Sequence, residues 1–238
     1  MMSTPIPIIP LDRLALTFLP VLVVVVILYR WSLGVFTPVY AMGRMLIQLL
    51  LVGYVLAFVF ETEHSGIVLS VLTGMLAIAS WIALGPLQQK DRGQYAKALF
   101  SIALGGVLTL LLVTRGVLDL QPWFNPSKVI PLAGMIFANS MTAISLAADR
   151  FYAELEKAPY AQARNIALRA ALIPITNSLF AVGLVSLPGM MTGQILAGVE
   201  PLVAARYQIM VMCMLYGSSG ASAACYLALL KGDHSAKA

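Results

Sequence analysis

Long uncharged apolar runs alternate with short charged segments along most of the chain. A run of about 17–25 apolar residues is long enough to cross the hydrocarbon core of a bilayer as a helix. By this criterion the pattern predicts uninterrupted spanning helices over Leu14–Tyr29, Val39–Phe60, Ser65–Gly85, Ala98–Val113, Val129–Ala148 and Tyr207–Leu230. We therefore expect an all-α, polytopic integral membrane protein.

A seventh apolar stretch, Leu172–Val199, is predicted to be broken. It has 28 residues without a charge, and a straight helix of that length would measure roughly 42 Å against a hydrocarbon core of about 30 Å. We interpret it as an interfacial or re-entrant first half followed by a span, because irregular backbone at that depth must lie against protein or a wet cavity. The chain then forms one transmembrane domain, residues 1–238, with about seven helices. The breaking residues are Pro174, Gly183, Pro188, Gly189, Gly193 and Gly198.

Basic residues orient the predicted helices, because Lys and Arg collect in cytoplasmic loops. With the N-terminus outside and the C-terminus inside, only four of the fifteen Lys and Arg residues are external, namely Arg13, Arg115, Lys128 and Arg206. The opposite orientation would reverse this bias. The side of the C-terminus depends on whether Leu172–Val199 spans.

Composition and charge exclude several classes of protein. Hydrophobic residues make up 60% of the chain and charged residues 11%, whereas a soluble domain has roughly a quarter charged residues. The net charge of +5 is expected from cytoplasmic loops and requires no nucleic-acid partner. Cys213 and Cys225, twelve residues apart on one predicted helix, are roughly 18 Å apart and cannot form a disulfide with each other.

The sequence also lacks the features of a proton-coupled or catalytic chain, while Na⁺ coupling through carbonyl and hydroxyl groups stays open. All ten acidic residues and both histidines lie in loops or at the ends of predicted spans, so no side chain is placed as an intramembrane proton relay. Gly193–Gly198 has the glycine spacing of a nucleotide-binding P-loop, but Val199 and Glu200 stand where Lys and Ser or Thr are needed. We expect no catalytic residue and no cofactor in this chain.

The longest hydrophilic stretch, residues 149–170, is predicted to lie on the cytoplasmic side. It mixes both charge signs with aromatic residues, and Pro159 interrupts any continuous helix, so we expect two short amphipathic helices. The stretch is either a solvated connector or a docking surface for a cytoplasmic partner. The candidate docking residues are Arg150, Glu154, Arg164 and Arg169.

Polar residues near the broken stretch are candidates for a transport path. Asn177, Thr192 and Gln194 either line such a path or form hydrogen bonds between helices. Glu61, Glu63 and Glu200 offer hard oxygen ligands for a trivalent metal at the outer mouth, or are solvated loop carboxylates. The methionines around positions 190 and 210 fill gaps between helices or ligate a soft ion.

Several segments of the chain together resemble one known family. The second and fifth predicted spans contain such runs, at Arg44–Leu49 with Val52–Leu56 and at Ile130–Ile136 with Asn139–Met141. The most specific run is Arg169–Pro174 followed by Val182–Gly193, with the letters VGLVSLPGMMTG. These runs resemble the FetB-type (YbbM) permeases, and the resemblance covers most of the chain. It departs from the family pattern at Leu155–Pro159, where either the cytoplasmic loop is shorter or a stretch of the loop is absent from this sequence.

The resemblance implies the membrane subunit of an ATP-binding-cassette transporter. A separate cytoplasmic ATPase would bind ATP and Mg, the permease would pair as a homodimer in a bacterial inner membrane, and the cargo would be iron or a related metal or complex. Similar plant proteins are linked to aluminium tolerance. The family match and the broken stretch together suggest a hinge at Pro188 and Gly189. Two alternatives stay open, a stand-alone secondary transporter or channel and a membrane scaffold that transports nothing.

Overall fold

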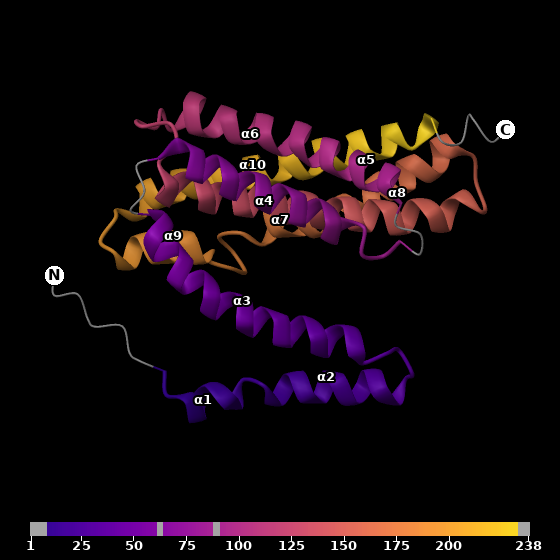
Figure 1. Cartoon of the computed structure of the whole chain (residues 1–238), viewed down its shortest axis with the longest axis horizontal. Coiled ribbons are helices and arrows are strands. Elements are labelled where there is room, and N and C mark those ends of the chain that lie inside the picture. Colours follow the sequence, from indigo (N-terminus) through magenta and orange to yellow (C-terminus); the bar gives the residue numbers. More distant parts are fainter. Residues whose placement is uncertain (1–8, 61–63, 88–90, 233–238) are drawn as a thin grey trace. The chain divides into compact units, whose positions relative to one another are not determined.

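The computed structural model describes residues 9–60, 64–87 and 91–232. These residues are helical, with one isolated bridge between Val182 and Ser186 and no strand in the described part. The chain divides into two compact units, residues 1–61 and 62–238 (Figure 1). The predicted fold class, an all-α polytopic membrane protein, is confirmed. That residues 1–238 act as one permease domain stays a prediction.

The first unit consists of three helices, α1 (Leu11–Leu16), α2 (Leu19–Arg30) and α3 (Phe36–Phe60). Together α1 and α2 form a 20-residue apolar segment in which no residue is buried. An apolar surface of this kind is stable only where water is excluded. The segment matches the first predicted span, and α3 matches the second.

The described residues of the second unit form a bundle of five long rods and one short helix. The rods are α4, a continuous rod of α5, η1, α6 and η2, then α7, α8 and α10; the short helix is α9. Their bounds are Ser65–Ala83 (α4), Arg92–Ile102 (α5), Ala103–Val107 (η1), Leu108–Leu111 (α6), Leu112–Val117 (η2), Pro126–Leu155 (α7), Tyr160–Ala181 (α8), Gly189–Leu196 (α9) and Pro201–Leu229 (α10).

Six helical segments of the described chain are long and apolar enough to cross a membrane, one fewer than the seven predicted. The difference is α8. It has 22 residues, or about 33 Å, but it begins inside the stretch predicted to be a hydrophilic loop and carries Arg164 and Arg169. The bundle accepts this polar helix because one face is a buried stripe at four-residue spacing, Ala163, Ala167, Ala171 and Ile175.

The two short amphipathic helices predicted within residues 149–170 are not separate elements. The first is the end of α7 and the second is the start of α8. Pro159 occupies the N-cap of α8, where a missing N–H breaks no helical hydrogen bond, so the next helix begins at once. Buried Phe151 and Ala163 continue the packed interior to the tip of this α7–α8 hairpin.

The stretch Leu172–Val199 is broken as predicted, but the order of its two halves was predicted wrongly. We expected a short interfacial or re-entrant segment first and a long helix second, and the structure has the long helix first. The first half completes the long helix α8, and the second half contains α9, which has 8 residues and a length of about 12 Å. This helix is too short to span a membrane. Positive φ angles of +83° at Gly183 and +91° at Gly198 flank α9, and L side chains rarely adopt them.

The centre of the bundle depends on a close approach between the π-helix η1 and α10. A Cβ atom at Gly105 would lie 2.5 Å from Ser222 Oγ and 2.8 Å from the Ser222 backbone nitrogen. At Gly106 it would lie 3.1 Å from a methyl carbon of Ile136 on α7. Glycines therefore set the distances between three rods, as small residues do in membrane bundles.

Replacement of Gly105 by Ala is predicted to destabilise the bundle. Alanine favours a helix by up to about 1 kcal/mol over glycine, but overpacking against backbone costs about 1–3 kcal/mol. Thermal unfolding of the purified protein in detergent should show a lower Tm for Gly105→Ala than for the wild type. Gly74→Ala on α4 is the control, because no atom lies within 4 Å of its added Cβ. Equal Tm values for the two variants would contradict the proposed close packing.

Candidate functional site

A network of hydrogen bonds closes the end of the bundle that contains the α7–α8 hairpin. Gln94 Nε2 donates to Tyr152 Oη at 2.8 Å, and Tyr226 Oη donates to Gln94 Oε1 at 2.8 Å. Tyr160 Oη donates to the carbonyl of Leu227 at 2.8 Å. These bonds connect four elements, namely the start of α5, the end of α7, the start of α8 and the end of α10. The connected end of the bundle is the one where the chain leaves α10 (Figure 1).

The four predicted docking residues lie on this hairpin or further along α8. Arg150 and Glu154 form an ion pair of 2.8 Å with each other. The guanidinium of Arg164 donates to Asn165 Oδ1 at 2.9 Å and lies 5.8 Å from the centre of the Tyr160 ring. Arg169 is exposed on α8. All four therefore fall on α7 and α8, and their docking role stays a prediction.

The opposite end of the bundle contains a cavity of about 470 Å³. Four segments build it: the residues after η2, the first turns of α7, the short helix α9 and the first half of α10. Its apolar wall consists of Leu118, Leu120, Pro131 and Leu132, and three methionines complete that wall, Met135, Met190 and Met210.

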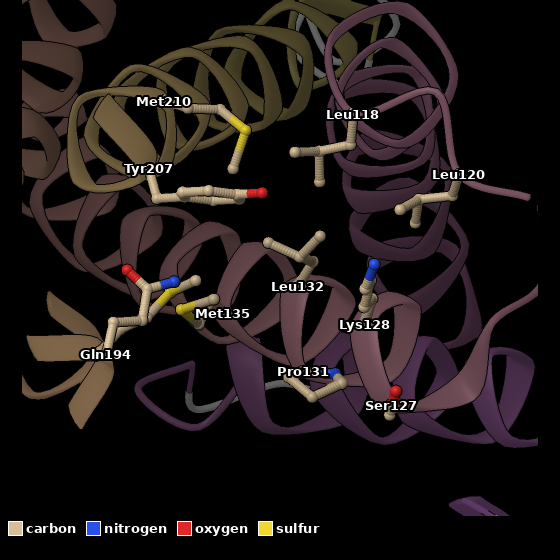
Figure 2. Close-up of a pocket in the computed structure, with 11 residues that line it drawn as sticks. Leu118, Leu120, Ser127, Lys128, Pro131, Leu132, Met135, Gln194, Tyr207 and Met210 are labelled. Carbon is tan, nitrogen blue, oxygen red and sulfur yellow. The ribbon is translucent and has the colours of Figure 1, made fainter. Parts of the chain in front are cut away.

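Polar groups enter this cavity from three elements. Lys128 is the one charged residue among the described side chains that line it, beside Ser127, Gln194 and Tyr207. In Figure 2 the Lys128 ammonium and the Tyr207 hydroxyl both point toward the space between Leu118 and Leu132. Gln194 Oε1 is buried without a hydrogen-bond partner among the described residues, and in Figure 2 it points away from the cavity, whereas the amide nitrogen lies on the cavity side. The cavity thus combines a cation and a few polar side chains with an apolar wall.

The predicted path residues are only partly brought together. Gln194 lines the cavity, whereas Asn177, exposed on α8, and Thr192, half-buried on α9, are not among the lining residues. Pro188 is the N-cap of α9 and Gly189 its first residue. The path and hinge roles stay predictions.

The predicted metal ligands do not form a described cluster. Glu200 is exposed at the N-cap of α10, and Glu61 and Glu63 lie outside the described residues. Among the described residues, no group of three or more His, Cys, Asp and Glu side chains is placed to hold a metal ion. The metal role of these glutamates stays a prediction.

Sequence reasoning missed the cavity residues Lys128 and Tyr207, whereas Met190 and Met210 were among the methionines that it singled out. Lys128 and Tyr207 come from segments about 80 residues apart in the chain, so no local spacing predicts their meeting. One signal was present. Lys128 is among the few basic residues that the predicted topology places outside, where it is an exception to the charge bias.

A family model matches residues 11–233 of this chain, under the description "Uncharacterised protein family (UPF0014)". The chain belongs to this UPF0014 family. The match covers both structural units, and the resemblance to FetB-type permeases seen in the sequence is confirmed.

Relatives in bacteria and plants are similar over most of their length. The "Probable iron export permease protein FetB" of Escherichia coli is 36% identical over 244 residues, covering 92% of this chain and 91% of the relative. "Protein ALUMINUM SENSITIVE 3" of Arabidopsis thaliana is 32% identical, covering 85% of this chain and 79% of the relative. The "UPF0014 membrane protein YjkA" of Bacillus subtilis is 31% identical, covering 84% and 85%. No solved structure matches the chain.

The hairpin end and the cavity end are predicted to face opposite sides of the membrane. The helix α7 that joins them has 30 residues, or about 45 Å, which exceeds a hydrocarbon core of about 30 Å. After Cys213 and Cys225 are replaced by Ala, single cysteines at the exposed positions Lys157→Cys and Ser127→Cys should react with a membrane-impermeant maleimide from opposite sides. Labelling of both positions from one side would contradict a spanning α7.

Proposed function

We propose that this chain is the membrane subunit of an ATP-binding-cassette transporter that exports iron or a related metal or metal complex. The observation that carries the proposal is the similarity over nine-tenths of both chains to a relative named as an iron export permease. The relative named for aluminium sensitivity supports metal-related cargo.

The energy for transport would come from a separate cytoplasmic ATPase that binds ATP and Mg. The sequence of this chain contains no P-loop signature, and no acidic residue of the described helices lies mid-way along a candidate span. A proton-driven mechanism would need such a group. The driving force is therefore proposed to enter through a partner.

The docking surface would be the α7–α8 hairpin. Its Tyr152 is linked to two other rods through Gln94 of α5 and Tyr226 of α10, so a displacement of the hairpin would be transmitted to α5 and α10. Arg164 and Arg169 are exposed and would meet acidic groups of the ATPase, beside the Arg150–Glu154 pair. One chain offers one such hairpin, so two ATPase subunits would require a homodimer of the permease.

The orientation proposed is N-terminus outside and C-terminus inside, in a bacterial cytoplasmic membrane. The hairpin end of the bundle carries Arg92, Lys157 and Arg164, and basic residues favour the cytoplasmic side. Although α8 is polar, it packs against both α7 and α10, and its 22 residues are long enough to cross a hydrocarbon core of about 30 Å. With α8 counted as a rod, seven rods would put the two termini on opposite sides.

Movement at the cavity would occur at α9. Pro188 and Gly189 begin this helix, and Gly183 and Gly198 flank it with positive φ angles. A short helix between two such turns can rotate with few backbone changes, in the manner of a hinge. Transport that is unchanged in both Pro188→Ala and Gly189→Ala would exclude the hinge.

Co-expression with the cassette ATPase encoded nearest to this chain should yield a stable complex in detergent. The complex should hydrolyse ATP at a rate different from that of the free ATPase. Arg164→Glu combined with Arg169→Glu should weaken the association at least tenfold, about 1.4 kcal/mol, because both changes place like charges at the contact. Arg115→Glu, in η2 and away from the hairpin, is the matched control and should leave the complex intact.

Failure to form a complex with any cassette ATPase of the same genome would overturn the proposal. A stand-alone transporter or channel would then move solute without ATPase, and a scaffold would move none. Flux measurements on vesicles that contain this chain alone would separate these two alternatives.

A further inference from the structure

The cavity at the α9 end has the size and form of a small-molecule site. Its volume of about 470 Å³ falls within the usual range of ligand pockets, about 300–1,000 Å³. Most of its wall is apolar, and a few polar groups converge on it from separate elements. This combination is typical of a site that binds an organic molecule and fixes its orientation.

The charge of the cavity disfavours a bare metal cation. Lys128 is the one described charged side chain in its lining, and it forms no ion pair with a described residue. Hard cations such as Fe³⁺ or Mg²⁺ bind carboxylate oxygens, and the described lining contains none. A hard cation would therefore meet a like charge without a compensating ligand.

The same features favour an anion with an apolar face. Lys128 is exposed, and its ammonium points toward the apolar wall that contains Leu118 and Leu132 (Figure 2), where it would pair with a carboxylate or another acidic group of the ligand. Methionines adapt their shape to an irregular partner, and Met135, Met190 and Met210 would pack on an aromatic or aliphatic surface. The Tyr207 hydroxyl, which points into the cavity (Figure 2), would accept a hydrogen bond from a hydroxyl or amide of the ligand.

We infer that this cavity binds an organic anion that carries an apolar or aromatic face and a hydrogen-bond donor. The inference rests on the proposed function only in taking this molecule as the cargo. Two sources supply the same chemistry, a free organic anion and the organic shell of an anionic metal chelate. Both present negative charge to Lys128 and an apolar surface to the methionines.

Binding can be measured without any ATPase, on the purified chain in lipid nanodiscs. The probe is 2,3-dihydroxybenzoate, which has a carboxylate, an aromatic ring and hydroxyl donors, and it is compared with its ferric complex, with Fe²⁺ and with Cu⁺. Equilibrium dialysis against empty nanodiscs corrects for partition into lipid. We expect saturable binding of the aryl carboxylate or of its ferric complex, and no saturable binding of either free metal ion.

Charge variants assign the binding to the cavity. Lys128→Ala should weaken binding at least tenfold, and Lys128→Arg should restore it to within about threefold, because only the charge is required. Arg206→Ala is the control, because it removes an exposed cation of α10 that does not line the cavity, and it should change the affinity less than threefold.

The two sources of the anion are distinguished by their affinities. Tighter binding of the ferric complex than of the free acid would identify a chelate as the source, and the reverse order would identify a free anion.

The inference is overturned if neither anion binds above empty nanodiscs, if Lys128→Ala binds as tightly as the wild type, or if Fe²⁺ or Cu⁺ binds in place of the anions. These results leave the proposed function standing when the complex with the ATPase still forms. Conversely, anion binding that depends on Lys128 without any ATPase complex would overturn the transporter proposal and keep the site.

Discussion

Inside a bilayer, a peptide group without a hydrogen-bond partner costs several kcal/mol, and this constraint determines where irregular backbone is placed in the second unit. Long helices satisfy their own backbone along the bundle, so turns and short elements are confined to its two ends. At one end the α7–α8 connection is only four residues long and is followed at once by α8. At the other end the residues after η2 and those around α9 leave a cavity of about 470 Å³. The division of the bundle into a closed end and a hollow end follows from this placement.

The closed end and the hollow end have different chemistry, and tightly packed rods join them. Tyrosine and glutamine side chains tie four rods together at the hairpin. Between the two ends, Gly105 and Gly106 bring η1 into close contact with α10 and α7. The rod that runs from α5 to η2 contains two π-helices, and such insertions often occur at functional sites. A displacement at the hairpin would therefore reach the cavity through rods that have little free space to absorb it.

The apolar runs predicted six of the rods, because hydropathy alone decides whether a long segment can face lipid. The same criterion divided α8 between the hydrophilic stretch 149–170, predicted to form short amphipathic helices, and the first half of the broken stretch Leu172–Val199. The buried stripe of Ala163, Ala167 and Ala171 on α8 is small, and small side chains add little hydropathy although they allow close packing. The exposed charges of Arg164 and Arg169 dominated the sequence pattern instead.

The cavity could not be predicted from the sequence for another reason. Lys128, Gln194 and Tyr207 meet only through the tertiary arrangement of α7, α9 and α10. Gln194 was selected as a polar residue in a broken stretch, and that reasoning led to one lining residue of the cavity.

The central claim is that this chain provides a path whose operation requires a separate ATPase. Its most direct test is transport in proteoliposomes that contain the permease with or without its ATPase, with ferric 2,3-dihydroxybenzoate as the cargo and ATP on the side of the α7–α8 hairpin. The account predicts movement of the cargo away from the hairpin side only when both subunits and ATP are present. Movement at the same rate without the ATPase would contradict it.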